Sequence, residues 1–411
     1  MKIAIITSGF LPVIDGVTVS GFQRVQRLSK WGHEVILFCP DYQSLKAIYP
    51  DWKQYTGNIL PNVKVVNLES QPFMGIDFER NVTRGSYGQM LQQLEAFSPD
   101  IIHVDEPERL FLGFLKIPGI DFAKKHNIPC IGFFRTNFTE YIEDFFPVKG
   151  IFLKFAENIA KKLIAWIYNS YDLTLIHSKT TEAKLVQMGI TNVHYRELWG
   201  FDPQKFREPK LKINDFFVRN YDLHQEIEEK VKILFIGRLT PDKGWDFGLN
   251  ALEQFKDLID WKRVAIFVAG DGPLNSEILE RLSKICPETH MLGRVPPEKV
   301  PQLFANTDIY VTNSEKENRA LTVVEALASG TPVIAPNAGG VIDNMTDGKT
   351  GFLYPPQDAQ AFVLSLKHLV EHDDLRHEMA DNTYGNVCEL TLDKAVENLL
   401  DIWKKQVSEN I

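Results

Sequence analysis

The chain has 411 residues, 44% of them apolar and 24% charged, which are the proportions of a folded globular protein long enough for two or three domains. Its 45 Lys and Arg residues against 54 Asp and Glu residues give a formal net charge of −9, which argues against a broad nucleic-acid surface. No run approaches the roughly 20 apolar residues of a membrane span. Four scattered cysteines without metal-ligand spacing predict no structural zinc and a reducing, cytoplasmic compartment.

Short apolar runs bounded by turn residues recur along the chain and predict strands. They occupy residues 2–7, 34–40, 63–68, 100–107, 129–134 and 172–178, then 231–237, 263–270, 308–314 and 331–336. Segments of helical periodicity lie between most of them, and this alternation produces parallel sheets covered by crossover helices. We therefore predict an α/β fold with two doubly wound, Rossmann-like domains.

The alternation breaks after residue 200, where two prolines and a highly charged stretch precede a fresh series of strands. We predict a first domain at residues 1–205, a linker at 206–230, a second domain at 231–385, and a C-terminal helix within 386–411 that packs back on the first domain. Ligands of doubly wound sheets bind outside the carboxyl ends of the strands. The expected active site is therefore the cleft between the domains.

A glycine loop follows the first predicted strand. Gly16 stands just before a helix, where backbone N–H groups and the helix N-terminus can approach an anion closely. A plain strand-to-helix turn has the same sequence features. Taken alone, this loop leaves both interpretations open.

The second half carries a more specific set of residues. Gly237 ends a predicted strand, and Arg238 and Lys243 follow it close to a helix start, where two cations suit a diphosphate. The sequence AGDGP comes next at residues 269–273, and GRV follows at 293–295. All of these loops are expected at the carboxyl edge of the second sheet.

Two glutamates complete the set. Seven residues separate Glu317 from Glu325, and the second lies on a helix that opens near Leu321, so both carboxylates can face one pocket. The ordered motifs G-R-L and K-G, G-D-G-P, E-x7-E and a late G-G loop resemble the donor domain of retaining GT-B glycosyltransferases of family 4. The resemblance covers essentially the whole chain, including G-F-D-P-x-x-F at residues 200–206.

The resemblance implies a role for each matching residue. Arg238 and Lys243 would hold the nucleotide diphosphate and neutralise the leaving group, so no metal or other cofactor is required. Glu325 would accept hydrogen bonds from the ribose hydroxyls, and Glu317 would lie near the donor sugar. The positions expected to contact the nucleotide sugar are Gly16, Gly237, Gly270, Arg294, Val295, Arg319, Leu321, Thr322 and Glu325. The acceptor hydroxyl would attack on the face that the diphosphate leaves, which retains the anomeric configuration.

The sequence departs from the family pattern at two places. Arg135 stands where the family usually has a histidine, and Arg319 with Ala320 replaces an aromatic residue and a glycine. Arg135, which we count among the catalytic candidates, has two explanations. It pairs with a nearby carboxylate, for which Asp105, Glu106, Glu140 and Glu143 are the candidates, or it meets an anionic group on the acceptor or donor sugar. We favour the second.

The acceptor side is less specific. The segments DEPERL at residues 105–110 and TNFTEY at 136–141 resemble glycolipid-forming members of the family. The expected acceptor-binding residues are Asp105, Glu106, Thr136, Asn137 and Tyr141. Residues 148–168 are apolar and basic with helical spacing, which fits peripheral contact with an anionic membrane at its inner face, or a core helix with solvated lysines.

These inferences lead to one principal function and two alternatives. The principal one is transfer of a hexose from a UDP-sugar to a hydroxyl of a lipid or sugar acceptor. A soluble phosphorylated sugar is the alternative acceptor, as in sucrose-phosphate-forming relatives, and the two arginines at unusual positions would suit it. A catalytically silent sugar-nucleotide-binding protein is the alternative of another class.

Overall fold

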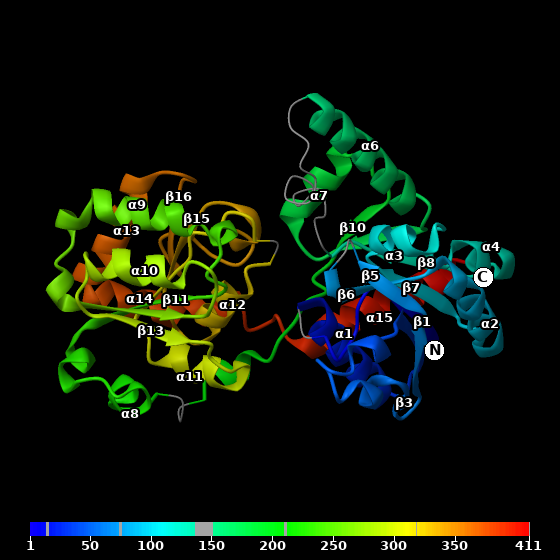
Figure 1. Cartoon of the computed structure of the whole chain (residues 1–411), viewed down its shortest axis with the longest axis horizontal. Coiled ribbons are helices and arrows are strands. Elements are labelled where there is room, and N and C mark those ends of the chain that lie inside the picture. Colours follow the sequence, from blue (N-terminus) through cyan, green and yellow to red (C-terminus); the bar gives the residue numbers. More distant parts are fainter. Residues whose placement is uncertain (14–15, 74–75, 136–150, 209–211, 318, 411) are drawn as a thin grey trace. The chain divides into compact units, whose positions relative to one another are not determined.

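The computed structural model describes residues 1–13, 16–73, 76–135, 151–208, 212–317 and 319–410 (Figure 1). The chain forms two compact units. Unit 1 consists of Met1–Gly200 together with Leu392–Ile411, and unit 2 consists of Phe201–Thr391. Each unit is built around its own sheet and its own hydrophobic core.

Unit 1 contains an eight-stranded sheet in which only the edge pair formed by β3 and β4 is antiparallel. Its spatial order is β10 (Val193–Tyr195), β9 (Leu173–Ile176), β8 (Cys130–Phe133), β7 (Ile101–Asp105), β1 (Lys2–Thr7), β2 (Glu34–Pro40), β4 (Val63–Leu68) and β3 (Gly57–Leu60). A separate antiparallel ribbon joins β5 (Ser70–Phe73) to β6 (Ile76–Val82).

Helices cover both faces of this sheet, which is why its central strands read as unbroken apolar runs. They are α1 (Gly16–Lys30), α2 (Tyr87–Phe97), α3 (Pro107–Phe114), α4 (Ile120–His126), α6 (Ile151–Tyr168), α7 (Lys179–Gln187) and α15 (Leu392–Glu409). Ala4 and Ile6 of β1 pack towards α2, α3 and α4, whereas Ile3 and Ile5 pack towards α1 and α15. Successive side chains of a strand point to opposite faces, so one apolar strand serves both cores.

The C-terminal helix α15 belongs to unit 1. Its Trp403 is fully buried, and Val396 and Leu399 pack in the same core as α1. The ring of Trp403 meets the His103 ring edge-on at 5.3 Å. The last helix therefore closes one face of the N-terminal sheet.

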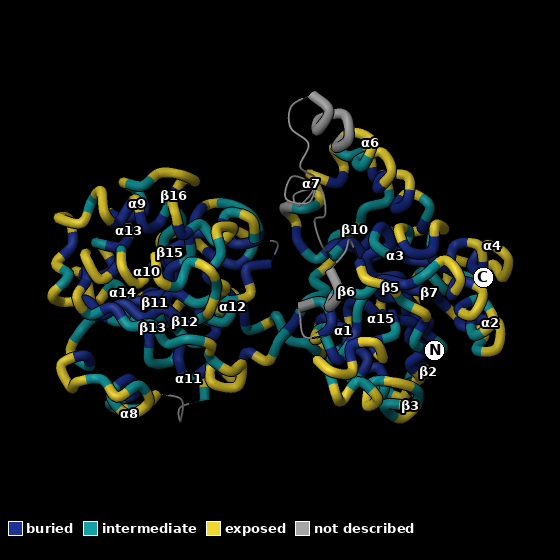
Figure 2. Tube along the Cα trace, viewed as in Figure 1, coloured by how far each residue is buried: buried dark blue, intermediate teal, exposed yellow. Residues whose placement is uncertain are grey.

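Unit 2 contains a six-stranded sheet in which every neighbouring pair is parallel. Its order is β13 (Thr289–Gly293), β12 (Val264–Ala269), β11 (Val231–Ile236), β14 (Ile309–Val311), β15 (Val333–Pro336) and β16 (Gly351–Tyr354). The helices are α8 (Phe216–Tyr221), α9 (Trp245–Gln254), α10 (Asn275–Ser283), α11 (Val300–Ala305), α12 (Leu321–Ala328), α13 (Ala359–Glu371) and α14 (Asp373–Thr383). Strands β12, β14 and β15 are buried along their whole length (Figure 2).

The predicted linker is corrected by the structure, because residues 206–230 lie within unit 2 and the units divide between Gly200 and Phe201. The Phe217 side chain is fully buried, and its ring stacks on that of Phe267 in β12 at 3.8 Å. Ile227 is fully buried as well. The segment is buried at these two positions despite the charged residues around them, because the two apolar side chains anchor it to unit 2.

The described helices were also compared with the dimensions of a bilayer. Within the described ranges, none of them combines the length and the apolar character that crossing a membrane requires.

Candidate active site

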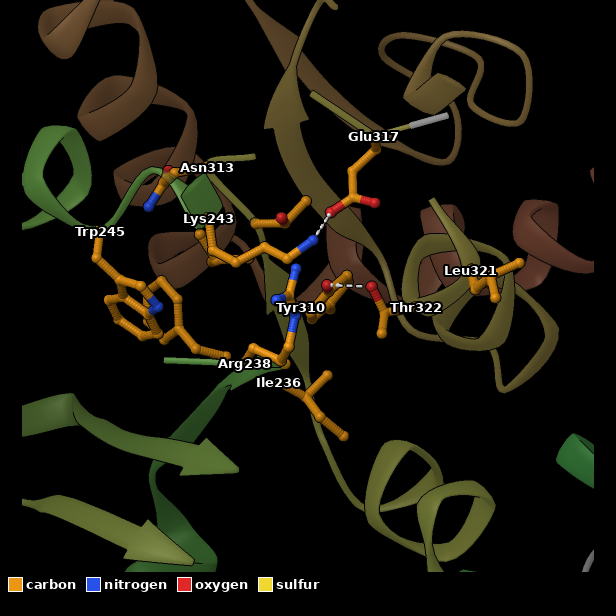
Figure 3. A pocket seen from close by; sticks show the side chains of 13 residues that line it. Ile236, Arg238, Lys243, Trp245, Tyr310, Asn313, Glu317, Leu321 and Thr322 are labelled. Atoms are coloured by element: carbon orange, nitrogen blue, oxygen red, sulfur yellow. Dashed lines mark hydrogen bonds and ion pairs between the residues drawn. The ribbon is translucent and has the colours of Figure 1, made fainter. Parts of the chain in front are cut away.

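A cavity of about 250 Å³ opens in unit 2 at the carboxyl ends of β11 and β14 (Figure 3). Ligands of parallel sheets bind at this edge. The cavity is formed by the ends of the two strands, the turn before α9 with the first residue of that helix, the loop that carries Glu317, and the first turn of α12. The lining residues are Phe235, Ile236, Gly237, Arg238, Lys243, Trp245, Tyr310, Val311, Thr312, Asn313, Glu317, Leu321 and Thr322.

Lys243 and Glu317 face one another across the cavity, although 74 positions separate them in the chain (Figure 3). The Lys243 ammonium donates to Glu317 Oε1 at 2.6 Å, and about a quarter of each side chain is exposed. An ion pair with this much access to solvent contributes little to folding, because water screens it. Its two charges therefore remain available to a ligand.

Arg238 lies at the mouth of the same cavity, directly after Gly237. Its Nη2 donates to Asp242 Oδ2 at 3.1 Å, and 67% of the Arg238 side chain is exposed. A surface pair four residues apart is weak and easily exchanged for a stronger anionic partner. The cavity thus presents two cations from one loop.

The loop that carries Glu317 is held from behind by the G-G loop. The Gly340 amide donates to the Glu317 carbonyl at 2.5 Å, and Asn344 Nδ2 donates to the Arg319 carbonyl at 3.1 Å. Gly339 has a φ of +56°, and a Cβ there would come within 2.6 Å of the Glu317 carbonyl oxygen. Glycine at this position is therefore required for the close approach of the two loops.

A second close approach explains Gly237 and Gly270. Gly270 follows β12 with a φ of +137°, and a Cβ built on it would lie 1.8 Å from the Gly237 carbonyl oxygen. The Gly237 amide in turn donates to the Ala269 carbonyl at 3.0 Å. Gly270 does not line the cavity, so its role in the structure is to let β11 and β12 end side by side.

The first turn of α12 is fixed by a buried tyrosine. Tyr310 OH and Thr322 Oγ1 are 2.6 Å apart, and both residues line the cavity (Figure 3). Ala320, the residue before α12, has a left-handed φ of +51°, a conformation that favours glycine. Arg319 beside it is buried. The helix N-terminus and the Thr322 hydroxyl are thereby aimed at the cavity.

Glu325 lies one turn further along α12, outside the cavity lining. Burial raises the pKa of its carboxyl group to about 7, because the charged form loses its hydration. Among the described residues, no side chain or amide donates a hydrogen bond to this carboxylate. A half-buried carboxylate without such a donor suits a ligand that brings hydroxyl groups.

Two predicted nucleotide contacts lie at the edge of the sheet, away from the cavity. Arg294 follows β13, and its Nε is 3.3 Å from Asp271 Oδ2 while 86% of its side chain is exposed. Val295 is the next residue and is partly exposed. The structure therefore gathers Gly237, Arg238, Lys243, Glu317, Leu321 and Thr322 around one cavity and leaves Gly270, Arg294, Val295, Arg319 and Glu325 beside it.

The cavity has further lining residues that the sequence did not single out, namely Phe235, Ile236, Trp245, Tyr310, Val311, Thr312 and Asn313. Tyr310 and Asn313 belong to the apolar run at residues 308–314, whose polar members were treated as strand. The Asn313 side chain accepts from Tyr354 OH at 2.9 Å and is buried. A buried amide directly after a parallel strand is a signal that could have identified it.

In unit 1, Gly16 is the first residue of α1, and Asp105 and Glu106 lie at the end of β7. The Glu106 side chain is buried and accepts a hydrogen bond from the Ser8 hydroxyl. Thr136, Asn137 and Tyr141, expected to bind the acceptor, lie outside the described residues, as do Glu140 and Glu143.

Asp105 is the centre of a buried charged cluster. Both oxygens of its carboxylate accept from the Arg24 guanidinium, and Arg24 Nη1 also lies 3.0 Å from His103 Nε2. Burial alone would raise the pKa of Asp105, but Arg24, His103 and Arg135 outweigh it and hold this pKa well below its usual range. Burial lowers the pKa of His103 to about 4, so this ring is neutral at pH 7.

Arg135 joins this cluster from the end of β8. Its Nη1 lies 3.9 Å from Asp105 Oδ1 and donates to the Val17 carbonyl at 3.5 Å, while Nη2 donates to the Ser20 hydroxyl. Its guanidinium also lies 5.3 Å from the centre of the Phe133 ring. The structure thus gives Arg135 the carboxylate partner of the first explanation and connects it to the first turns of α1.

In the ranges that the structure describes, no three His, Cys, Asp or Glu side chains are grouped so that they could hold a metal ion.

Comparison with known proteins identifies the family of the chain. The family model described as "Glycosyltransferase Family 4" matches residues 14–196, and the one described as "Glycosyl transferases group 1" matches residues 221–386. The chain belongs to glycosyltransferase family 4. It is a glycosyltransferase, as its motifs predict.

Curated relatives are similar over most of the chain. A GDP-mannose-dependent alpha-mannosyltransferase of Mycobacterium tuberculosis is 28% identical over 92% of this chain and 90% of its own. The sulfoquinovosyl transferase of Arabidopsis thaliana is 29% identical over 70% of this chain and 53% of its own. An alpha-monoglucosyldiacylglycerol synthase of Streptococcus pneumoniae is 25% identical over 93% and 82%.

Solved structures share the fold. Anabaena HepE in complex with UDP superposes with a TM-score of 0.73 at 16% identity, covering 98% of this chain and all of that one. The sucrose-phosphate synthase of Thermosynechococcus elongatus gives a TM-score of 0.69 at 17% identity and covers 99% of both chains. The fold is GT-B, with two Rossmann-like domains, and the predicted fold class and family are confirmed.

Proposed function

We propose that this glycosyltransferase moves a hexose from a UDP-sugar to a hydroxyl of a glycolipid or saccharide acceptor, with retention of the anomeric configuration and without a metal ion. The observation that carries the proposal is the convergence of Arg238, Lys243 and Glu317 on one cavity at the carboxyl edge of the unit 2 sheet. Two cations, one carboxylate and a helix N-terminus are the groups that a sugar diphosphate needs.

The cations act on the leaving group. Negative charge grows on the diphosphate as the sugar–oxygen bond breaks, and preorganised cations stabilise that charge without a metal. Lys243 is paired with Glu317 at 2.6 Å, so an arriving diphosphate exchanges one anionic partner of Lys243 for another. Glu317 is then released to face the donor sugar, where a carboxylate stabilises developing positive charge at the anomeric carbon.

The bond changes balance within the two substrates. The acceptor oxygen forms a bond to the anomeric carbon, the bond from that carbon to the diphosphate oxygen breaks, and the acceptor proton passes to a phosphate oxygen of the departing nucleotide. Attack and departure occur on the same face, so the configuration is retained. In this scheme the protein supplies position and charge, and no side chain acts as a nucleophile.

Glu325 and the first turn of α12 orient the nucleotide. The Leu321 and Thr322 amides lie at the helix N-terminus, where a diphosphate is favoured, and the half-buried Glu325 carboxylate accepts from ribose hydroxyls. Donation from a hydroxyl would lower the pKa of Glu325, which burial raises in the unliganded site. Nucleotide binding and deprotonation of Glu325 are therefore coupled.

GDP-mannose is the second candidate donor, because a GDP-mannose-dependent mannosyltransferase is similar over 92% of this chain. Lipid acceptors are favoured by the similarity to an alpha-monoglucosyldiacylglycerol synthase. A phosphorylated sugar remains the alternative acceptor.

The experiment is a donor-by-acceptor panel that measures released nucleotide. UDP-glucose, UDP-galactose and GDP-mannose are each offered with diacylglycerol, monoglycosyl diacylglycerol, a neutral sugar and a sugar phosphate. We expect turnover with a UDP-sugar, and an NMR coupling constant of the product that matches the donor configuration. Binding of every nucleotide sugar without turnover would instead identify a catalytically silent protein. An inverted product would overturn the retaining scheme.

A further inference from the structure

The loop that leads to Glu317 meets the turn that carries Lys243 at one wall of the cavity. Asn313 lies in this loop, two residues after the end of β14 and four before Glu317. Its side chain is buried, and it lies beside the base of the Lys243 side chain (Figure 3). The two segments that supply the ion pair of the cavity are therefore in contact at Asn313.

Two glycines next to Lys243 make this contact close. Gly244 has a left-handed φ of +73°, and a Cβ built on it would lie 2.2 Å from the Asn313 carbonyl oxygen. Gly248 lies one turn further along α9, and a Cβ there would lie 2.1 Å from Asn313 Nδ2. Both distances are far inside van der Waals contact, so only glycine lets the turn and the helix rest directly on Asn313.

The orientation of the Asn313 amide is fixed by Tyr354, the last residue of β16. The Tyr354 hydroxyl donates to Asn313 Oδ1 at 2.9 Å, and both side chains are buried. The phenol ring lies 5.9 Å from the ring centre of Phe247 on α9 and 5.2 Å from that of Phe362 on α13. Burial raises the pKa of Tyr354 well above its usual value, so the hydroxyl remains a donor at neutral pH. With its oxygen on Tyr354, the amide presents its nitrogen to Gly248.

The turn that carries Lys243 depends on such contacts for its position. It is a single 3₁₀ turn, Pro241–Lys243, in which the Lys243 amide donates to the Thr240 carbonyl at 3.1 Å. A local bond of this kind fixes the shape of a turn, whereas its place against the sheet depends on the elements it packs on. Asn313 supplies a packing contact at Gly244, directly after Lys243.

We propose that Asn313, held by Tyr354, is a positioning residue that sets the place of the Lys243 ammonium relative to Glu317 and to the departing diphosphate. This role rests on the proposed function, because it is exerted through the cation assigned to the leaving group. Tyr354 does not line the described cavity, so a change at its hydroxyl reaches the chemistry through Asn313. A shift of a catalytic group by about 1 Å is enough to slow a reaction strongly.

The first test needs no substrate. Hydrogen–deuterium exchange of the full chain, read by mass spectrometry without nucleotide, follows the peptide that covers residues 239–248. Tyr354→Phe should speed exchange in this peptide roughly threefold or more, because Asn313 loses the bond that orients it. The matched control is Thr331→Val, which removes another buried hydroxyl bond of unit 2, from Thr331 Oγ1 to the Phe304 carbonyl at 3.0 Å. Equal exchange of the peptide in the two variants would overturn the proposal.

The second test is kinetic and uses whichever sugar nucleotide of the panel gives turnover. Tyr354→Phe should lower kcat roughly 3–10-fold, the equivalent of one buried hydrogen bond, and change KM little, because the loss falls on the charge that develops in the leaving group. Thr331→Val should keep the wild-type kcat. Gly248→Ala should lower kcat as well, although alanine favours a helix, because its methyl group displaces the Asn313 amide.

The Lys243→Ala background separates a positioning role from a general loss of structure. There Tyr354→Phe should have no further effect on kcat, because the ammonium through which it acts is absent. The same factor in both backgrounds would overturn the proposal, as would a wild-type kcat in Tyr354→Phe when Lys243→Ala has lost activity. A wild-type kcat in Lys243→Ala would instead refute the diphosphate assignment itself, and the role of Asn313 would fall with it.

Discussion

Replacement of Arg135 by histidine separates the two explanations for this side chain. The variant removes the contacts with Val17, Ser20 and the Phe133 ring, while Asp105 keeps both hydrogen bonds from Arg24. A hydrogen bond contributes about 0.5–1.5 kcal/mol and a cation–π contact about 0.5–2 kcal/mol. Because the imidazole retains part of the packing, we expect unit 1 to lose about 2 kcal/mol, which lowers its Tm by roughly 4–8 °C.

The kinetic consequence distinguishes a positioning residue from one that meets a substrate anion. Arg135 connects β8 to the first turns of α1, so its loss should lower kcat/KM by the same factor, less than roughly tenfold, for a neutral sugar and a sugar phosphate. A direct contact with an anionic substrate would instead cost that substrate roughly 10–200-fold and spare the neutral one. A selective loss of this size would refute the interpretation of Arg135 as a positioning residue.

The control for this experiment is Arg109→His. Arg109 has the same kinds of partners in unit 1, since its guanidinium donates to the Arg80 carbonyl at 3.1 Å, pairs with Glu79 at 3.3 Å and lies 4.6 Å from the Phe73 ring centre. It lies in the first turn of α3 and is not one of the expected acceptor-binding residues. We expect a comparable loss of stability without a change in kcat/KM.

Four further predictions follow from the described contacts. Lys243→Ala should lower kcat roughly 10²–10³-fold and shift Tm little. The control Lys284→Ala, which removes an exposed ion pair of unit 2, should leave kcat unchanged. A wild-type kcat in Lys243→Ala would contradict the diphosphate assignment. Asp105→Asn should cost unit 1 about 3–5 kcal/mol in chemical denaturation, because it leaves buried guanidinium groups without their carboxylate. Burial raises the pKa of Glu325 to about 7, above its usual value, so the protonated form favours the folded state and this contribution to stability is lost as the pH rises through that pKa. The Tm of Glu325→Gln relative to wild type should therefore increase between about pH 5 and about pH 8. A constant difference would contradict the burial argument. Turnover should persist in excess EDTA, and complete loss that Mg²⁺ restores would contradict the metal-independent scheme.

The sequence predicts the strands and the loops of unit 2 well, for a physical reason. A parallel strand buried on both faces must be apolar throughout, so runs such as residues 231–237 stand out. The close approaches in the site admit one residue type: a Cβ at Gly270 would lie 1.8 Å from the Gly237 carbonyl oxygen, and a Cβ at Gly339 would lie 2.6 Å from that of Glu317. Where the backbone leaves room only for glycine, a glycine in the sequence indicates the local geometry.

Charged partners could not be predicted in the same way. Arg24 and Asp105 are 81 positions apart; Arg24 lies within an ordinary helix, and Asp105 ends an ordinary strand. Of the carboxylates considered for Arg135, the sequence offered no means of choosing Asp105, because the choice depends on how β7 and β8 align. Pairing of distant charges follows from the sheet order, which composition and periodicity do not contain.

Burial of apolar side chains could not be predicted from the sequence either, and the errors went in both directions. Phe217 and Ile227 are buried in a segment whose charges led to its interpretation as a linker, whereas Ile159 and Trp166 are exposed in a helix whose periodicity suits the core. Helical spacing shows that residues share a face, but it does not show whether other residues cover that face. Two residues of the same polarity therefore differ in role according to their neighbours in space. In α6 the buried side chains Ile164, Ala165 and Tyr168 meet α7 and β9, whereas Ile159 and Trp166 of the same helix stay exposed, and only the packing of neighbouring elements distinguishes the two sets.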